Sequence, residues 1–209
     1  MHSIFRYLIL LTLTFNPLHA SEANEVLNKS KNWFKESNYW SLEFHVKIFH
    51  AGSTDVSEQR GDILIGKDNL YRLRIPGITF FNDGQSFWQW NIDQKQVLIK
   101  DIEDLANTPH PSELLFKYLE CDALSLKKDK WKNSAVYVLK LDPSKYKDQF
   151  KSLEVWLSAK DYSPIRLFTT DLMDNASVYE ISNLKRMKNV APQNFKYTGI
   201  KGVEEIDMR

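Results

Sequence analysis

The chain has 209 residues, 43% of them apolar, so it is long enough to bury a substantial core and to form one domain of moderate size. Its 28 basic and 27 acidic side chains nearly balance, which excludes the strongly basic surface that nucleic-acid binding needs. Cys121 is the single cysteine and excludes an intrachain disulfide; a lone cysteine of this kind is more often a small buried hydrophobic residue than a nucleophile.

Residues 1–20 have the three successive regions of a secretory signal peptide. Arg6 precedes the apolar run LILLTLTF, and the small residue Ala20 follows it. The run is shorter than the roughly 20 residues that span a bilayer, and no cysteine directly follows it that could carry a lipid. We therefore expect cleavage near Ala20 and an exported single domain of residues 21–209, with an uncleaved anchor as the alternative.

An amphipathic helix is predicted at residues 22–36, with Ser21 as its N-cap. The hydrophobic period then changes from 3.6 to 2. In residues 40–48 apolar and polar side chains alternate without a break, which predicts a strand with one buried and one solvated face. The apolar set of this strand is Trp40, Leu42, Phe44, Val46 and Ile48.

Further strands are predicted at residues 61–67, 70–76, 86–92 and 96–102. The spacers between them are short and contain Gly, Asp or Asn, so the strands should form an antiparallel meander. Two tryptophans, Trp88 and Trp90, lie one residue apart and therefore share a face. They raise the question of whether the apolar face is filled by the chain itself or is kept open for a ligand.

The middle of the chain predicts a short helix at residues 112–119, because Ser112 is a good N-cap and Leu114, Leu115, Tyr118 and Leu119 have helical spacing. Strands return at residues 135–141, 152–158, 165–172, 177–184 and 195–197. An antiparallel run of nine to eleven strands tends to curl. The expected class is therefore α+β, mostly β, with a curved antiparallel sheet and two or three helices over one face.

Three stretches resemble the LolA family of periplasmic carriers of outer-membrane lipoproteins. They are GDILIGKDNLYRLR at residues 61–74, NDGQSFWQW at residues 82–90, and Gln96-Val97. The start of the middle helix after Thr108-Pro109 and the ending with Phe195 and Gly202-Val203 also fit, so the resemblance spans nearly the whole chain after residue 20. It implies an incomplete barrel of antiparallel strands under a lid of short helices, with an apolar cavity between them.

The resemblance also implies a function. A member of the family would bind the acyl chains of lipoproteins in the periplasm, receive them from an inner-membrane ABC-type exporter and pass them to an outer-membrane acceptor. It would act as a monomer, without cofactor, metal or catalytic residue. The residues expected to line the cavity are Leu42, Phe44, Val46, Ile63, Ile65, Tyr71, Leu73, Trp88, Trp90, Leu115 and Val155.

Lys67 has the strand parity of Ile63 and Ile65 and stands where the family often has an arginine that holds the lid. We therefore expect Lys67 to contact the lid, although lysine lacks the planar fork of donors that arginine has. The alternative is a lysine whose stem follows the rim and whose ammonium reaches solvent.

Two other functions are open to this sequence. An enzyme has little support, because acids such as Asp62, Asp83 and Asp101 fall at turns or exposed strand positions, and no common catalytic motif occurs. A carrier of another lipid or glycolipid, or an envelope protein that senses lipoproteins, could share the same half-barrel. Polar ligands for a head group at the mouth of the cavity would distinguish such a carrier.

Overall fold

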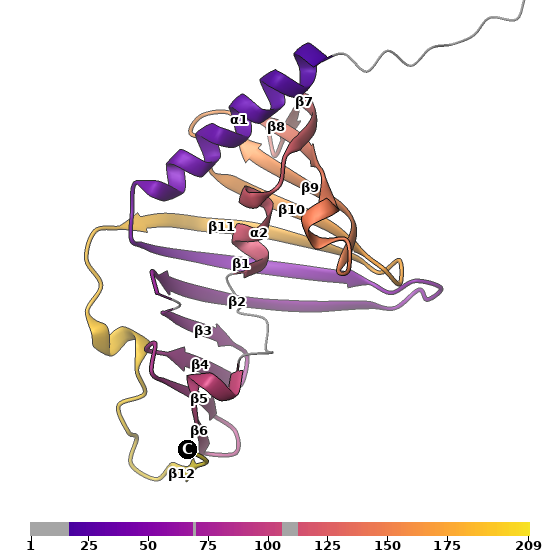
Figure 1. The fold of residues 1–209 in the computed structure, drawn as a ribbon. Coiled ribbons are helices and arrows are strands. Elements are labelled where there is room, and N and C mark those ends of the chain that lie inside the picture. Colours follow the sequence, from indigo (N-terminus) through magenta and orange to yellow (C-terminus); the bar gives the residue numbers. More distant parts are fainter. Residues whose placement is uncertain (1–16, 69, 106–112) are drawn as a thin grey trace, which may run out of the picture.

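The computed structural model describes residues 17–68, 70–105 and 113–209 (Figure 1). The described helices are α1 (Pro17–Lys35), α2 (Glu113–Glu120) and the 3-10 helices η1 (Ile102–Leu105), η2 (Pro143–Tyr146) and η3 (Pro192–Phe195). The described strands are β1 (Tyr39–Phe49), β2 (Val56–Gly66), β3 (Tyr71–Ile75), β4 (Ile78–Asn82), β5 (Ser86–Asn91), β6 (Gln96–Asp101), β7 (Ala123–Trp131), β8 (Ser134–Leu141), β9 (Phe150–Ser158), β10 (Pro164–Asp171), β11 (Ala176–Met187) and β12 (Glu204–Asp207).

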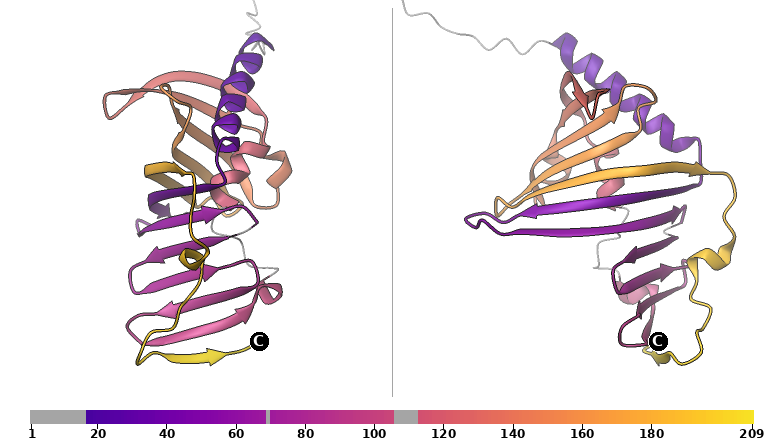
Figure 2. Two further views of the ribbon diagram at one scale, coloured as in Figure 1. Left: turned by 90° about the vertical axis from the view of Figure 1, so that its left-hand side faces the viewer. Right: turned by 180° about the vertical axis from the view of Figure 1, so that it is seen from behind.

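All of these strands form one twelve-stranded sheet in the order β12-β6-β5-β4-β3-β2-β1-β11-β10-β9-β8-β7. The neighbours pair antiparallel, except that β12 is parallel to β6. The terminal strands of this order, β12 and β7, lie far apart, so the sheet is strongly twisted but not closed (Figure 2). The predicted incomplete barrel is confirmed.

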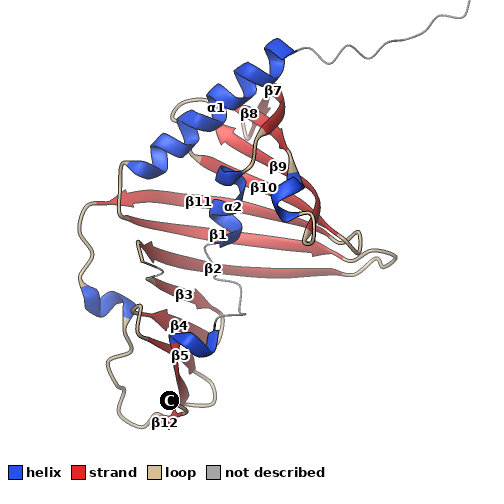
Figure 3. Cartoon of the chain, viewed as in Figure 1, coloured by secondary structure: helices blue, strands red, loops and turns tan. Residues whose placement is uncertain are grey.

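Both helices lie on the same face of the sheet, which we call the helix face. α1 runs obliquely across the β7 and β8 end, and α2 lies in front of β1 and β11 (Figures 1 and 3). The main hydrophobic cluster of the molecule joins α1 side chains such as Leu27 and Phe34 to the apolar set of the strands. The other surface of the sheet is called the back face.

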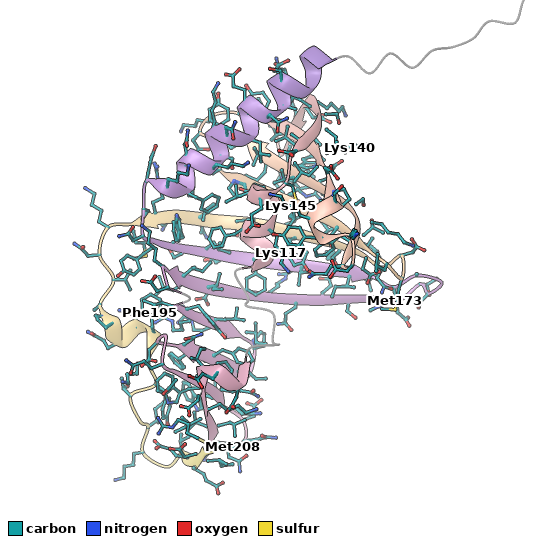
Figure 4. The ribbon with its side chains drawn as sticks, in the orientation of Figure 1. Lys117, Lys140, Lys145, Met173, Phe195 and Met208 are labelled. Atoms are coloured by element: carbon teal, nitrogen blue, oxygen red, sulfur yellow. The ribbon has the colours of Figure 1, made fainter. Side chains whose placement is uncertain are left out.

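The back face carries the polar set of β1 to β3 and a second, smaller apolar cluster near β5 and β6. Residues 188–203, which we call the C-terminal strap, pass from β11 towards β12 (Figure 2). Phe195 of the strap, labelled in Figure 4, is buried and stacks on Tyr39 with ring centroids 6.0 Å apart. Tyr197 packs with Trp88, Val97 and other apolar residues of the second cluster. The strap is therefore anchored to the sheet at two buried aromatic rings.

Several predicted elements need correction. α1 begins at Pro17 instead of residue 22, so Ser21 lies inside the helix and does not cap it. Proline suits the first turn of a helix, where a backbone N–H has no intrahelical acceptor. Residues 195–197 form no strand, because Phe195 and Tyr197 are buried against the sheet as part of the strap. The apolar run of the predicted signal peptide lies outside the described residues.

Three strands were not predicted: β4, β7 and β12. β4 carries adjacent phenylalanines, Phe80 and Phe81, and therefore shows no simple alternation. β7 is an edge strand rich in lysine, a composition that blunts sheet edges but resembles a loop in a sequence. β12 is exposed along its whole length and joins the sheet through backbone pairing with β6.

The neighbouring strands pack so closely around position 61 of β2 that only glycine fits there. Gly61 pairs with Phe44 of β1, and the backbone of Arg74 in β3 approaches it from the other side. A Cβ atom at this position would lie 2.3 Å from the Arg74 carbonyl oxygen and 2.7 Å from Cζ of Phe44. Distances this short force backbone movement, because a carbonyl cannot rotate away as a side-chain tip can.

We expect Gly61→Ala to lower the free energy of unfolding by about 1–3 kcal/mol, the usual cost of overpacking. Chemical denaturation with the tryptophan fluorescence signal measures this. Ser57→Ala, at an exposed position of the same strand, is the matched control and should change stability by less than about 0.5 kcal/mol. Equal stability of the two variants would contradict the close-packing account.

Candidate functional site

A pocket of about 560 Å³ lies on the helix face, between the C-terminal end of α1, α2, the beginning of β1 and the end of β2. Its lining divides into an apolar wall and a polar rim. The wall is formed by Phe34, Trp40, Ile65, Phe116 and Leu119, and the rim by Lys31, Lys35, Ser37, Gly66, Lys67 and Asp68. An apolar wall with few polar groups is the usual composition of a site for a small apolar ligand.

Three aromatic rings from three elements meet in this wall. Phe34 of α1 and Phe116 of α2 pack edge to face with centroids 5.1 Å apart, and Trp40 of β1 lies 5.6 Å from Phe116 and 5.9 Å from Phe34. Such pairs contribute about 0.5–1.5 kcal/mol beyond the burial of their area. The three rings therefore join both helices to the sheet at the pocket.

Trp40 adds one polar group to the apolar wall. Its side chain is buried, and its indole Nε1–H has no hydrogen-bond partner in the part of the chain that the structure describes. A buried donor without an acceptor is unfavourable.

The helices around the pocket are held by hydrogen bonds at their buried sides. The hydroxyl groups of Ser30 in α1 and Tyr118 in α2 are 3.0 Å apart, and burial raises the pKa of Tyr118. At the end of α1, the Ser37 hydroxyl donates to the carbonyl oxygen of Met187 at 2.9 Å and is also 2.9 Å from that of Tyr39. These bonds fix the position from which Phe34 and Phe116 enter the pocket.

Cys121, directly after α2, is buried, as its isolation in the sequence suggested. Its thiol contacts the Lys117 carbonyl oxygen at 3.6 Å, and burial raises the thiol pKa. A thiol with a raised pKa is a poor nucleophile. The residue therefore contributes to packing beneath α2.

Most of the predicted cavity residues come together on the helix face. The main cluster contains Leu42, Ile63, Ile65, Tyr71 and Val155 as buried members, with Phe44 and Leu73 half-buried against it. Val46 is buried on the same strand but lies outside that cluster. Leu115 lies in α2, and its side chain is outside the described residues. Their role in lipid binding stays a prediction.

The placement of Trp88 and Trp90 in the same cavity is wrong. In the sheet, Leu73 pairs with Phe80, and Phe80 pairs with Gln89, so Trp88 and Trp90 point to the opposite face. There Trp88 and Trp90 belong to the cluster covered by Tyr197 of the strap. It is Phe87, from the other set of the same strand, that lies in the helix-face cluster.

Lys67 is exposed at the end of β2, on the rim of the pocket. Its backbone N–H donates to the Asn38 carbonyl oxygen at 3.1 Å. Within the described residues its ammonium makes no hydrogen bond with α1 or α2, so a lid contact stays a prediction. Together with Lys31 and Lys35 of α1 it gives the rim a positive charge, which Asp68 balances in part.

Phe116 and Asn82 are two residues of this region that the sequence pattern did not single out. Phe116 is one helical turn before Leu119, and this spacing could have placed both on one side of α2. Asn82 is almost fully buried and hydrogen-bonds the Tyr71 side chain across the strand pair; burial raises the pKa of Tyr71 to about 12. Asn82 begins the stretch at residues 82–90 that resembles the family, but its burial could not be predicted because it ends the unpredicted strand β4.

Of the helices in the described part of the chain, none is both long and apolar enough to cross a membrane. Nor do residues 17–68, 70–105 and 113–209 bring together three or more side chains of the types that commonly bind metal ions.

An open antiparallel sheet that carries its helices and an apolar pocket on one face defines a half-barrel protein. The family model described as "Outer membrane lipoprotein carrier protein LolA" matches residues 36–198. The chain therefore belongs to the LolA family. The comparison with curated proteins finds no significant match.

Solved structures are similar to this chain at low sequence identity, and the first two below have TM-scores above 0.5. An uncharacterized conserved protein from Thermus thermophilus is 14% identical with a TM-score of 0.55, over 89% of this chain and 99% of that one. LprF from Mycobacterium bovis is 10% identical with a TM-score of 0.53, over 83% and 98%. A LolA superfamily protein from Nitrosomonas europaea is 12% identical with a TM-score of 0.45, over 84% and 97%.

The packing of α2 on α1 can be measured by a double-mutant cycle. We expect Phe34→Leu and Phe116→Leu to show a coupling energy of about 0.5–1.5 kcal/mol in the free energy of unfolding, because their rings are in edge-to-face contact. Phe34→Leu combined with Phe168→Leu, on the opposite face near Trp156, is the control pair and should be additive. Additivity for Phe34 and Phe116 would show that α2 does not pack against α1 in solution.

Proposed function

We propose that this protein carries lipoproteins in the cell envelope by taking their acyl chains into the helix-face pocket. The observation that carries this proposal is an apolar pocket of about 560 Å³ walled by three aromatic rings, in a chain of the LolA family. Acyl chains form no hydrogen bonds, so their binding depends on apolar area. That is what the wall of Phe34, Trp40 and Phe116 provides.

Binding and release both follow from the same contacts. Burial of apolar surface is worth roughly 25 cal/mol per Å², and each CH₂ group contributes about 0.8 kcal/mol. Several long chains would therefore bind almost irreversibly to a rigid open cavity. In the empty protein the rings of α1, α2 and β1 contact one another, and separating them costs free energy that offsets part of this gain. A moderate net affinity permits transfer to the next protein.

The route of the cargo belongs to the same proposal. Residues 1–20 would direct export and be removed near Ala20, and residues 21–209 would act in the periplasm as a monomer. An inner-membrane ABC-type exporter would supply the lipoprotein, and an outer-membrane acceptor would receive it. Family membership supports this route, and the carriage of acyl chains in an apolar pocket would require neither a cofactor nor a catalytic residue.

Leu73→Glu tests the proposal. Leu73 does not line the pocket but is half-buried farther along the helix face, beyond its partner Ile63 and next to Tyr71. A carboxylate there can reach water in the empty protein, but acyl chains that extend from the pocket along the helix face would bury it. We expect normal folding by circular dichroism and a loss of lipoprotein that copurifies with the exported protein, measured by mass spectrometry. The control is Leu124→Glu, an exposed position in β7.

The two variants give distinct outcomes. If Leu73→Glu carries as much lipoprotein as Leu124→Glu, acyl chains do not use the helix face and the proposed function is wrong. If neither variant nor the wild type carries a lipoprotein but all carry a free lipid, the alternative below replaces it.

The rim of the pocket favours one alternative, a carrier of an anionic lipid. Lys31, Lys35 and Lys67 lie around an apolar wall, which is the arrangement that would hold a negatively charged head group above inserted chains. A lysine near an anionic lipid surface contributes about 1 kcal/mol. The lipid-modified end of a lipoprotein gives these lysines no comparable anionic partner.

Removal of positive charge from the rim of the pocket distinguishes the two proposed functions. The double variant Lys31→Gln, Lys67→Gln should keep wild-type loading of lipoprotein, whereas extraction of an anionic lipid from vesicles would fall roughly 30-fold for two lysines at about 1 kcal/mol each. Lys95→Gln, Lys130→Gln removes the same charge from exposed positions away from the pocket and is the control. Unchanged lipoprotein loading in the rim variant supports the first function, and a loss of lipid extraction that the control does not share favours the anionic lipid.

A further inference from the structure

A second and larger pocket, of about 820 Å³, lies on the back face of the sheet. Its floor is formed by β11, β1, β2 and β3 with Leu64 among mostly polar side chains, and residues 189–191 and 194 of the C-terminal strap form one side. The twelve-stranded sheet separates it from the helix-face pocket. Neither the family pattern nor the apolar site accounts for it.

One cross-strand row runs through this pocket. Lys185 of β11 pairs with Ser41 of β1, Ser41 pairs with Leu64 of β2, and Leu64 pairs with Arg72 of β3. Paired residues point to the same face, and adjacent strands are about 4.8 Å apart, so the Cα atoms of Lys185 and Arg72 are about 14 Å apart. Lys185 is therefore the direct neighbour of Ser41, and Arg72 lies one strand beyond it, across the buried side chain of Leu64.

Arg72 is the unusual member of this row. It is half-buried, and its contact with the described residues is one long hydrogen bond from Nη1 to Oδ1 of Asn194 in the strap, at 3.4 Å. Its buried Nε–H has no partner among them. Burial and the nearby charge of Arg74 lower the pKa of Arg72, and the charge of Asp62 opposes them only in part.

The other charges around the pocket do not neutralise Arg72. Asp62 is bound by Arg74, whose Nε lies 2.9 and 3.0 Å from its two carboxylate oxygens. His45 is hydrogen-bonded to Glu58 at 2.8 Å. Glu43 is exposed and is paired with Asp62 and Ser182, one row away from Arg72. Arg60 and Lys185 are exposed and add positive charge.

We propose that the back-face pocket binds a phosphate group between Arg72 and Lys185, over Ser41 and beside the strap. Guanidinium groups match the geometry of phosphate with two parallel donors, and Arg72 has donors unused within the described protein. Ser41 supplies a hydroxyl donor, and Lys185 a second positive charge. A partly buried cation without a counter-ion is costly, so a bound anion would stabilise the folded protein.

Calorimetric titration of the full chain with inorganic phosphate, in a buffer free of other multivalent anions, tests this site. We expect saturable binding by the wild type, weakened about tenfold or more in Arg72→Gln and in Lys185→Gln, as expected for loss of a hydrogen bond to a charged group. Lys188→Gln, an exposed lysine of the strap outside the pocket, is the matched control and should bind like the wild type.

Thermal unfolding separates a binding role of Arg72 from a structural one. If the site binds phosphate, Arg72→Gln should be at least as stable as the wild type without phosphate and should lose the stabilisation that phosphate gives to the wild type. Arg72→Gln that is less stable without phosphate yet is stabilised by phosphate as much as the wild type would overturn the proposal. So would the absence of any binding to the wild type.

Two sources of the phosphate group are distinguished by a third titration. Binding of sn-glycerol 3-phosphate more tightly than inorganic phosphate would identify a lipid head group, and equal or weaker binding would identify free phosphate. Leu73→Glu should leave all of these values unchanged, because Leu73 lies on the other face. Failure of phosphate binding therefore does not bear on lipoprotein carriage, and the reverse is also true.

Discussion

The structure depends on one constraint: a curved sheet of twelve strands has an apolar face that two helices must cover. α1 lies over the β7 and β8 end, and α2 lies over β1 and β11. Under these helices the side chains of Leu139, Val155 and Leu157 are fully buried, whereas Phe44, Leu73 and Phe80 towards the other end are only half-buried. The pocket lies at the edge of the helical cover, where the apolar wall continues but the helices end.

The helices are attached differently from the strands, and this difference matters for a carrier. Each strand is held to its neighbours by backbone hydrogen bonds along its length. The described part of α2 is held by side-chain contacts instead, which include the rings of Phe34 and Trp40 and the bond between Tyr118 and Ser30. Lys117 and Glu120 of α2 also bond to side chains within residues 145–149. Contacts of this kind sum to a few kcal/mol. Movement of α2 away from the sheet is therefore far less costly than loss of a strand.

The sequence predicted the class of fold because the strands alternate clearly. The apolar set of β1 was predicted correctly to face the helices, and Leu42 and Phe44 lie there. Alternation alone assigns the residues of a strand to two sets but does not say which set is inside. Which set of β5 faces the helices follows from the pairing of β5 with β4 and of β4 with β3. Because the adjacent Phe80 and Phe81 break the period-2 alternation, the sequence does not reveal β4, and the face of Trp88 and Trp90 cannot be predicted from their own strand.

Trp88 and Trp90 lie on the back face of the sheet, where they form part of a second apolar cluster. They are covered by Tyr197, and Phe195 fixes the strap to Tyr39 at the other side of the back-face pocket. Long-range contacts of this kind cannot be found by periodicity, because the strap has none. The strap is anchored to the back of the sheet and the helices pack on its front, so the two pockets share no contact across the sheet other than its strands. The proposed apolar and anionic ligands would therefore occupy separate sites.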